Sequence, residues 1–438
     1  MSRSSVPAMG AHPIEHARQS RCLGRLAGSV LIAAVLLGAC AASPLTSIES
    51  AVAPSTAVQS PGSMPSPQPS LSLSPETAWS SITWTASDPA PFSGPGNQYV
   101  FAGVPWAGGT VLVGEEVPLP SGNVEGVVWT SPDNAHWQRI PNTGGTFSGS
   151  EIEAIAASGS TLVAVGDTRL EDSATSLTPP LGIAWTSPDG THWERVADEG
   201  GVLGNIVLHA VVAGSTGFLA SGNDLGGQTA LAFSNDGVHW RREDTEAVFA
   251  NSNVTGITWT GQDFVAVGGH NVAQPSGVIS QIPGNAAAWW SNDGQNWQAS
   301  DVPSPGYSLE SVQPWIDSLR ASGLPPCPRC VSAPAEWRSS DDGRTWRQLP
   351  LAATADYPGL ASLVVGQRLV NLQDQPLRAT WSADVQTWTS LQVKGSPIPD
   401  TAQLVAAVGG QTVIAIASVT GASANDQEDM RVFAGQLH

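Results

Sequence analysis

Short segments in which apolar residues alternate with polar or small residues recur along the chain from about residue 77 to its end. They come in groups separated by turns that contain Gly. Two such segments open each group, as at 151–156 (EIEAIA) and 161–166 (TLVAVG). Alternation with a period of two is typical of β-strands, and two strands joined by a tight turn form a hairpin. The pattern therefore predicts an all-β domain built from hairpins.

A third strand and the start of a fourth follow in each group, joined by a turn of nearly constant sequence. The clearest copy is 183–193, IAWTSPDGTHW. We name the strands A to D in order and this connection the C–D turn. Every copy has an Asp four residues before a Trp, in the pairs Asp133 and Trp137, Asp189 and Trp193, Asp236 and Trp240, Asp293 and Trp297, Asp342 and Trp346, and Asp384 and Trp388. Such regular spacing indicates a repeat architecture.

The number of repeats follows from the A and B strands. These are expected at seven places, namely 99–114, 150–166, 205–222, 252–269, 308–322, 359–372 and 403–418. Residues 430–434 supply a last C strand, and 78–82 resemble the D strand at 192–196. We therefore expect the N-terminal strand to close the last group, which removes a free sheet edge. The sequence predicts a seven-bladed β-propeller with four-stranded blades over 77–438.

The C–D turns resemble the Asp-box (BNR) repeat, whose usual pattern is Ser-x-Asp-x-Gly-x-Thr-Trp. Residues 339–346 fit it in full, and the other copies are one residue shorter. Sialidases, sortilin-type receptors, xyloglucan-cleaving propellers and a photosystem assembly factor carry this repeat. The resemblance implies a propeller of the sialidase-like and sortilin-like kind, with the turns away from the ligand-binding face. It does not specify a function, because its members differ in function.

The repeated turn residues are expected to be structural. An Asp side chain can accept backbone N–H groups within a turn, a Gly supplies a positive φ, and a Trp packs over the hairpin. The glycines in question are Gly190, Gly237, Gly294 and Gly343. Catalysis or sugar stacking by the same residues is the weaker alternative.

The N-terminal part of the chain has the features of a targeting segment. Four arginines precede an apolar run at 26–37, and residues 37–40 (LGAC) resemble the lipobox of bacterial lipoproteins. The resemblance implies a signal peptide over 1–39, cleavage before Cys40, and a lipid on the Cys40 sulfur that anchors the protein to the outer face of the cell membrane. A secretory signal with a chance Cys is the alternative. Residues 40–76 are rich in Ser and Pro, so we expect a disordered tether there.

Charge and cysteine content exclude some classes of partner. The formal net charge is -19 and Lys394 is the only lysine, so nucleic acid is not an expected partner. Cys327 and Cys330 are predicted to form a local disulfide, with a redox pair as the alternative. No second CxxC exists, so no zinc site is predicted, and no motif predicts a cofactor or another metal. We expect a monomer.

The loops between B and C strands differ most among the repeats. They occupy 115–126, 167–182, 270–285, 322–335 and 420–429. With the D–A loops they share the end of the blades opposite the C–D turns, and variation confined to one face predicts an interaction surface. Four polar residues end successive B strands and are candidates for binding a ligand there: Glu115, Asp167, Asn223 and His270. Plain solvated strand ends are the alternative.

A sialidase-like mechanism would need three arginines around a carboxylate, a Tyr nucleophile with a Glu, and an Asp acid/base. Tyr307 and Tyr357 lie in D–A loops, but the same position holds Phe in other repeats, which indicates aromatic packing between blades. These residues are Phe92, Phe147 and Phe249. The arginines expected near this face are few: Arg169, Arg320, Arg329, Arg368 and Arg378.

The Arg-Ile-Pro motif of that family precedes its first Asp-box, whereas Arg139 to Pro141 follow one here, so the motif cannot be carried over. Our leading hypothesis is a surface-anchored propeller that binds a glycan, a peptide or an envelope partner without chemistry of its own. A glycoside hydrolase of the sialidase type acting at the same face is the rival. An assembly or stability factor for a membrane complex is the third possibility.

Overall fold

The computed structural model describes residues 78–119, 122–168, 181–243, 247–273, 279–303, 306–324, 335–349, 361–373, 377–384, 387–395, 398, 405–409, 412–420 and 428–438. Several residues from the sequence predictions lie outside these ranges, namely Cys40, Arg169, Cys327, Arg329, Cys330 and Tyr357. The signal and tether segments lie outside them as well.

The described residues form antiparallel four-stranded sheets whose strand order follows the chain. The first three sheets contain β2 (Gly96–Trp106), β3 (Gly109–Pro118), β4 (Glu125–Ser131) and β5 (Gln138–Arg139); β6 (Ser150–Ser158), β7 (Thr161–Thr168), β8 (Gly182–Ser187) and β9 (Glu194–Arg195); and β10 (Ile206–Ala213), β11 (Phe218–Asp224), β12 (Thr229–Ser234) and β13 (Trp240–Arg242). The next two contain β14 (Ser252–Trp259), β15 (Phe264–Ala273), β16 (Ile279–Ser291) and β17 (Gln298–Ala299); and β18 (Ser308–Trp315), β19 (Ser318–Leu324), β20 (Ala335–Ser339) and β21 (Arg347–Leu349).

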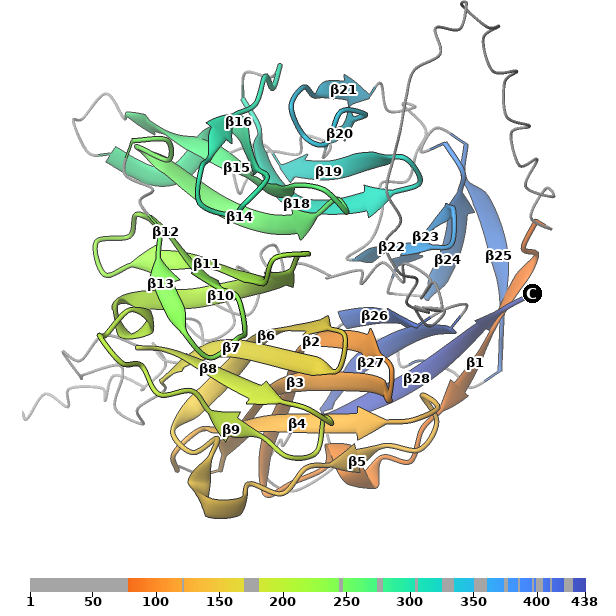
Figure 1. Cartoon of the computed structure of the whole chain (residues 1–438). Helices are drawn as coiled ribbons and strands as arrows, with labels where there is room; N and C mark the ends of the chain where they lie inside the picture. Colours follow the sequence, from red (N-terminus) through yellow and green to blue (C-terminus); the bar gives the residue numbers. More distant parts are fainter. Residues whose placement is uncertain are drawn as a thin grey trace, which may run out of the picture.

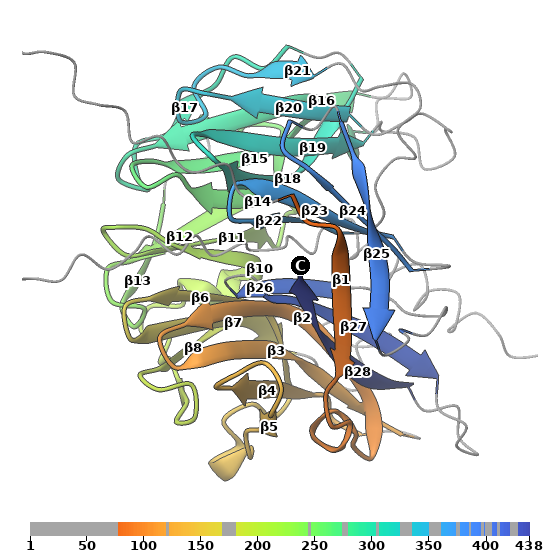
Figure 2. The same ribbon diagram turned by 90° about the vertical axis from the view of Figure 1, so that its right-hand side faces the viewer.

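The remaining strands form one eight-stranded sheet, in the order β22-β23-β24-β25-β1-β28-β27-β26. Their bounds are β1 (Ser81–Ala86), β22 (Ala361–Val365), β23 (Arg368–Gln373), β24 (Arg378–Ser382), β25 (Thr389–Gly395), β26 (Val405–Gly409), β27 (Thr412–Thr420) and β28 (Glu428–Leu437). The N-terminal strand β1 pairs antiparallel with β28 and parallel with β25 (Figure 2). The pairing with β28 adds the first strand of the described residues to the sheet that contains the C-terminal strand.

The sheets are arranged around a common axis (Figure 1). The strands that open successive antiparallel groups contact one another in the circuit β2, β6, β10, β14, β18, β22, β26 and back to β2, although β22 and β26 belong to the same eight-stranded sheet. Four-stranded sheets placed radially in this way form a β-propeller, so the predicted all-β propeller fold is confirmed. Three short 3-10 helices precede β2, β6 and β10: η1 (Ala90–Phe92), η2 (Thr143–Gly145) and η3 (Leu203–Asn205). Among the described residues, no helix has the length and apolar character needed to cross a membrane.

The hydrophobic core lies between neighbouring sheets. Val111 and Val113 of β3, for example, belong to the same buried cluster as Ile152 of β6 and Leu162 of β7. Successive side chains of a strand point to opposite faces, so a sheet between two neighbours buries both of its faces. This explains why β3 is a nearly continuous buried run.

The aromatic residues ahead of the first strands pack against tryptophans of their own sheets. The ring of Phe249 lies 4.7 Å from that of Trp289 and 5.5 Å from that of Trp297. Phe92 and Phe147 make the same two kinds of contact. Tyr307 precedes β18 in the same way, and its ring meets Trp337 edge-on at 5.6 Å. Tyr307 thus occupies a packing position rather than an isolated site.

Candidate functional site

The C–D turns are internally hydrogen-bonded. In the turn after β16, Asp293 Oδ1 accepts the backbone N–H groups of Gln295 and Asn296, each at 2.8 Å. Its Oδ2 accepts the side-chain amide of Asn296 at 2.7 Å. The indole N–H of Trp297 donates to Gly294 O at 3.1 Å, which closes the turn. Every part of the repeated motif therefore has a partner within the turn.

The other turns repeat these contacts. The closing indole donates to the backbone carbonyl three residues earlier in five copies, through Trp137, Trp193, Trp240, Trp297 and Trp346. In the first copy Asn134 replaces the Gly and has a φ of 63°. In the sixth copy Asp384 accepts the backbone N–H of Thr387 at 2.7 Å, and Trp388 packs at the edge of a buried cluster.

The fifth turn corrects one of the sequence predictions. The carboxylate with the structural role is that of Asp341, which accepts from Ser339 Oγ at 2.8 Å and from the Thr345 N–H at 2.9 Å. Asp342 instead adopts a positive φ of 55°. The reason is the extra residue in this copy: Asp341 keeps the two-residue spacing from the preceding Ser, and Asp342 is the insertion.

The turn glycines pack against the preceding sheet. A Cβ on Gly237 would lie 2.4 Å from Val163 Cγ2, and one on Gly294 would lie 2.6 Å from the Phe233 ring. Gly343 has the same relation to Val265, at 2.7 Å. All three glycines have a positive φ. Each of these turns therefore closes its own sheet and also fixes the distance to the sheet before it.

Hydrogen bonds within the turns also lower the pKa of five carboxyl groups: Asp133, Asp189, Asp236, Asp293 and Asp341. A hydrogen bond from the His136 side chain, helped by two backbone N–H groups, holds the pKa of Asp133 well below its usual range. The same contact raises the pKa of His136. For Asp293, burial would raise the pKa, but the hydrogen bonds from Asn296 and Gln295 outweigh it and lower the pKa to about 2. A carboxylate with such donors is a poor general acid at neutral pH.

Three of the four B-strand candidates share one register at the opposite end of the sheets. Glu115 pairs with Tyr99, Asp167 with Glu151, and Asn223 with Val207, in each case just before the irregularity of the first strand. Equivalent registers point side chains to the same side of their sheets. Glu115 and Asp167 are buried. A further contact joins two sheets, because Asn223 Nδ2 donates to Asn253 Oδ1 of β14 at 3.2 Å.

His270 does not belong to this set. It pairs with Ser252, one position further along the strand, and Gly269 takes the position that corresponds to Asp167. A shift of one residue turns a side chain to the other face of a strand. The His270 ring nitrogen instead lies 2.8 Å from Ser252 Oγ. The sequence VAVG occurs at both 163–166 and 265–268. Aligning the two copies shows that His270 lies one residue further along its strand than Asp167 does.

A β-bulge recurs in the first strand of five sheets and was not predicted. The pairing omits one residue at each bulge: Phe101, Glu153, His209, Thr255 and Glu310. Bulges re-aim a side chain and bend the strand. Thr255 Oγ1 donates to Leu309 O of the next sheet at 2.6 Å, and burial raises the pKa of Glu310 to about 7. In four of these five sheets the residue at the bulge is therefore polar, and simple alternation along the strand does not predict such a position.

One bulge residue completes an acidic cluster. Carboxylate oxygens of Glu151, Glu153 and Asp167 lie within 4.8 Å of one another. Oxygen donors of this kind are the ligands of Ca²⁺ and Mg²⁺, although a protein Ca²⁺ site uses about six to eight oxygens. Each of these residues also has other interaction partners in the structure. Of the three, the B-strand pattern had indicated only Asp167, and the alternating Glu-Ile-Glu at 151–153 was the available signal for the rest.

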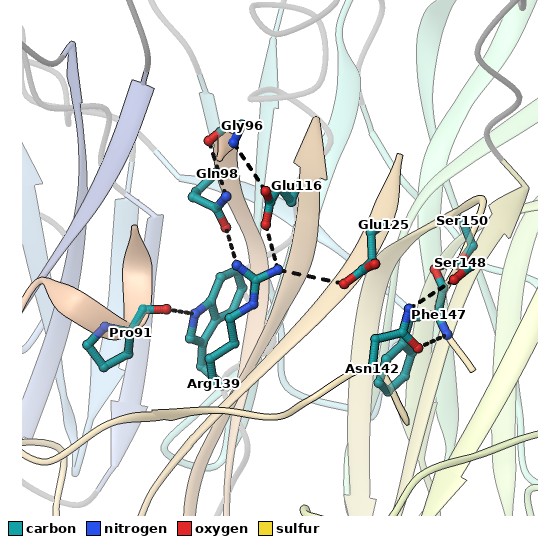
Figure 3. Close-up of polar contacts among 11 residues, drawn as sticks. Pro91, Gly96, Gln98, Glu116, Glu125, Arg139, Asn142, Phe147, Ser148 and Ser150 are labelled. Atoms are coloured by element: carbon teal, nitrogen blue, oxygen red, sulfur yellow. Dashed lines mark hydrogen bonds and ion pairs between the residues drawn. The ribbon is translucent and has the colours of Figure 1, made fainter. Parts of the chain in front are cut away.

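Arg139 of the Arg-Ile-Pro motif is bound within its own sheet (Figure 3). Its Nη2 lies 2.5 Å from Glu116 Oε2 and 3.7 Å from Glu125 Oε1. Its Nη1 donates to Gln98 Oε1 at 3.4 Å. Glu116 is buried and also accepts the Gly96 N–H at 3.1 Å. These contacts account for the charge of Arg139 without a ligand.

The other described candidate arginines lie in separate surroundings. Arg320 and Glu336 form a buried ion pair of 2.5 Å between β19 and β20. The Arg368 guanidinium lies over the rings of both Trp79 and Trp381. Arg378 is exposed at the start of β24. Arg320 thus contacts a carboxylate, whereas Arg368 contacts two indole rings.

No family model matches the chain, and no curated protein matches it. Solved structures of similar architecture include a Trypanosoma rangeli sialidase in complex with sialic acid, with 12% identity and a TM-score of 0.40 over 77% of this chain and 54% of the sialidase. YCF48 from Cyanidioschyzon merolae has 11% identity and a TM-score of 0.46 over 81% of this chain and 98% of that one. YCF48 bound to D1 peptide has 13% identity and a TM-score of 0.44, with coverages of 83% and 93%. The chain spans about half the length of the sialidase. Likeness at this level says nothing about what the present chain binds or catalyses.

Proposed function

We propose that the protein is an exported lipoprotein whose seven-bladed propeller binds a polypeptide or glycan through its B–C and D–A loop face. The circuit of seven first strands supports the blade count. The eight-stranded sheet then comprises two blades, β22–β25 and β26–β28 with β1, which β1 joins. The lipobox-like sequence before Cys40 supports attachment to the outer face of the membrane by a lipid on that residue.

One observation carries the assignment of the binding face. Glu115, Asp167 and Asn223 stand at equivalent positions of three successive sheets, at the end opposite the C–D turns. Asp167 pairs with Gly182 at one end of β8, whereas the turn follows Ser187 at the other. Polar groups that recur at one rim and lie beside variable loops are typical of an interaction surface.

A binding role without chemistry fits the contacts better than hydrolysis. Arg139 and Arg320 are neutralised by glutamates, and Tyr307 packs on Trp337. A sialidase-like site would use such groups to hold a carboxylate and attack the sugar. We expect the full chain to release no fluorophore from sialosides or other fluorogenic glycosides. Turnover that disappears in Asp167→Asn or Glu115→Gln would contradict the proposal.

Binding is tested directly with glycan and peptide arrays probed by the labelled full chain. We expect capture on a restricted set of spots and its loss in Asp167→Asn. The matched control is Glu194→Gln, which changes an exposed carboxylate next to a C–D turn. Equal capture by wild type and Asp167→Asn would move the binding surface away from this rim.

Anchoring is tested separately. Cys40→Ser should remove the lipid mass from the mature protein and release it from the membrane fraction. A role as an assembly factor for a membrane complex remains the third hypothesis, and it predicts that a pull-down of the lipidated protein from native membranes recovers the same subunits repeatedly. An empty pull-down together with array binding would favour a soluble glycan or peptide ligand.

A further inference from the structure

The N-terminal strand contacts two neighbouring parts of the ring at once. Along one edge, Ile82 to Ala86 pair antiparallel with β28, and the C-terminal residue adds hydrogen bonds at the end of the strand. Ser80 N–H donates to His438 O at 2.7 Å, and His438 N–H donates to Ser81 O at 3.0 Å. Along the other edge, β1 runs parallel to β25 (Figure 2). One short strand therefore joins the C-terminal residue and two adjacent blades.

Trp79, just ahead of β1, takes a place that another segment fills in other blades. In four of them the C-strand indole donates to a carbonyl in the segment leading into the first strand of the same blade. The pairs are Trp129 with Pro91, Trp185 with Thr146, Trp289 with Val248, and Trp337 with Pro303. The equivalent indole of Trp381 donates to Trp79 O at 3.0 Å. The blade of β22–β25 thus receives from the segment ahead of β1 a contact that those four blades make internally.

A stacked arginine strengthens this contact. The Arg368 guanidinium carbon lies 4.7 Å from the centre of the Trp79 ring and 4.5 Å from that of Trp381. The two indoles meet edge to face at 6.1 Å. A buried guanidinium against the faces of two indoles gains cation–π attraction from both. Arg368 therefore holds Trp79 on the blade of β22–β25.

The two edges of β1 differ in character. The β25 edge is parallel, and parallel pairing is slightly weaker per residue than antiparallel pairing. Of the β25 side chains only Leu391 is buried. The edge also depends on Gly395, whose φ is 86° and whose Cβ would lie 2.1 Å from Trp84 O. On the β28 edge, by contrast, Leu437 and Phe433 are buried in the core.

We propose that Trp79–Ala86 form a releasable clasp whose two edges open separately. The clasp leaves β25 first while it stays paired with β28, so that the seam between the last two blades opens without loss of the final sheet. Arg368 and its two indoles set the force or free energy needed to open the seam. Trp79 comes before β1 in the chain. A force applied to the segment before Trp79 therefore acts first on the contacts of Trp79 with Arg368 and Trp381. The order of opening does not depend on the lipid anchor proposed above.

Hydrogen exchange of the intact protein, followed by mass spectrometry, tests the order of opening. In the wild type we expect faster exchange in 389–395 than in 428–437. Arg368→Lys keeps the charge but loses the planar stacking, and it should accelerate exchange in 389–395 by about five- to tenfold while 428–437 stays unchanged. The matched control is Arg338→Lys, whose guanidinium lies 5.3 Å from the Trp315 ring in another blade. It should alter neither segment.

Equal acceleration of both segments in Arg368→Lys would show that the two edges form one cooperative unit, and it would overturn the proposal. So would an absence of any acceleration. If Arg368→Lys fails to fold, Lys394→Ala serves instead, since it removes the partly buried contact of 3.4 Å between Lys394 Nζ and Ser81 Oγ. The same pattern is then expected at a smaller factor, about twofold, and parallel changes in both segments again overturn the proposal.

Discussion

The two ends of the propeller blades are built on different principles. At the C–D end the same motif returns in blade after blade, and its polar atoms are bonded within the turn, as Asp293 and Trp297 illustrate. At the B–C end the strands finish in different residues, and polar groups reach across to the next blade, as Asn223 reaches Asn253. The C–D end thus has nearly the same sequence and internal hydrogen bonds in successive blades, whereas the B–C end differs from blade to blade.

We propose that the most repetitive part of the sequence is not the functional part, and this difference gives a physical reason. A turn glycine such as Gly237 must fit against Val163 of the preceding blade, so the geometry of the ring allows little variation there. The loops after Asp167 and Glu115, by contrast, differ in sequence and length. The comparison predicts that changes at the C–D end alter stability and that changes at the B–C end alter binding.

The largest expected effect is that of a methyl group on a turn glycine. Gly237→Ala introduces a side chain at a φ of 80° and places it 2.4 Å from Val163 Cγ2. Positive φ and overpacking together should lower the free energy of unfolding by about 2–4 kcal/mol, measured by urea denaturation. Gly159→Ala is the matched control, because its φ is 58° but nothing lies within 4 Å of the new Cβ. If Gly159→Ala lowered the free energy of unfolding as much as Gly237→Ala, packing against Val163 would not explain the effect.

The second prediction concerns pH and the inner strands. Glu310 titrates at 4.5 when unfolded, and burial raises its pKa to about 7 in the folded chain. Between these values only the unfolded state releases the proton, so the contribution of Glu310 to stability is largest below pH 4.5, falls as pH rises towards 7, and is constant above. The loss should be about 1–3 kcal/mol. In Glu310→Gln the midpoint of thermal unfolding should change less between pH 4.5 and 7 than in the wild type. The exposed change Glu194→Gln should leave the wild-type pH dependence intact. A wild-type slope that survives in Glu310→Gln would refute the assignment.

The third prediction separates the turn carboxylate from its neighbours. Asp293→Ala leaves the N–H groups of Gln295 and Asn296 without their acceptor and should cost about 1–2 kcal/mol of stability at pH 7. Asn292→Ala, an exposed change in the same turn, should cost less than about 0.5 kcal/mol. Because the pKa of Asp293 is lowered to about 2, its contribution is fully present above pH 4 and is lost as pH falls towards 2. Equal denaturation midpoints for the two variants would contradict the structural role of the turn.

The smallest expected effect on stability is at the other end. Asn223→Ala removes one partly buried hydrogen bond to Asn253 and should change the free energy of unfolding by less than about 1 kcal/mol. Array binding should nevertheless weaken if this rim is the binding surface. If Asn223→Ala lowered stability but kept the wild-type binding pattern, Asn223 would have the structural role that we expect at the C–D end.

Local patterns were sufficient to predict the strands and the turns. Alternation and the repeated Asp-to-Trp spacing depend on a few adjacent residues, so the hairpins at 151–166 and 254–268 could be located from sequence. The fifth turn was misassigned because two adjacent Asp residues offered alternative registers, and only the bonds of Asp341 decide between them. The parallel pairing of β1 with β25 joins residues about 300 apart, and no local pattern contains it.

The candidate site was predictable in outline only. The ends of the B strands could be counted from sequence, which places Asp167 and Glu115 correctly relative to each other. An extra Gly displaces His270 by one residue and turns it to the other face. The bulges at Glu153 and Glu310 each insert one residue that has no partner on the neighbouring strand, and this shift depends on the pairing of the two strands. The positions of His270, Glu153 and Glu310 thus depend on how neighbouring strands pair, and not on the β-propensity of the residues within one strand.

The most direct test compares one carboxylate from each end in a single binding assay. Labelled wild type, Asp167→Asn and Asp293→Asn are applied to the same glycan and peptide arrays, at a temperature at which all three are folded by circular dichroism. The account predicts that Asp293→Asn keeps the wild-type pattern of captured spots and that Asp167→Asn loses it. Loss of the pattern in Asp293→Asn with retention in Asp167→Asn would place the binding surface at the repeated turns and contradict the account.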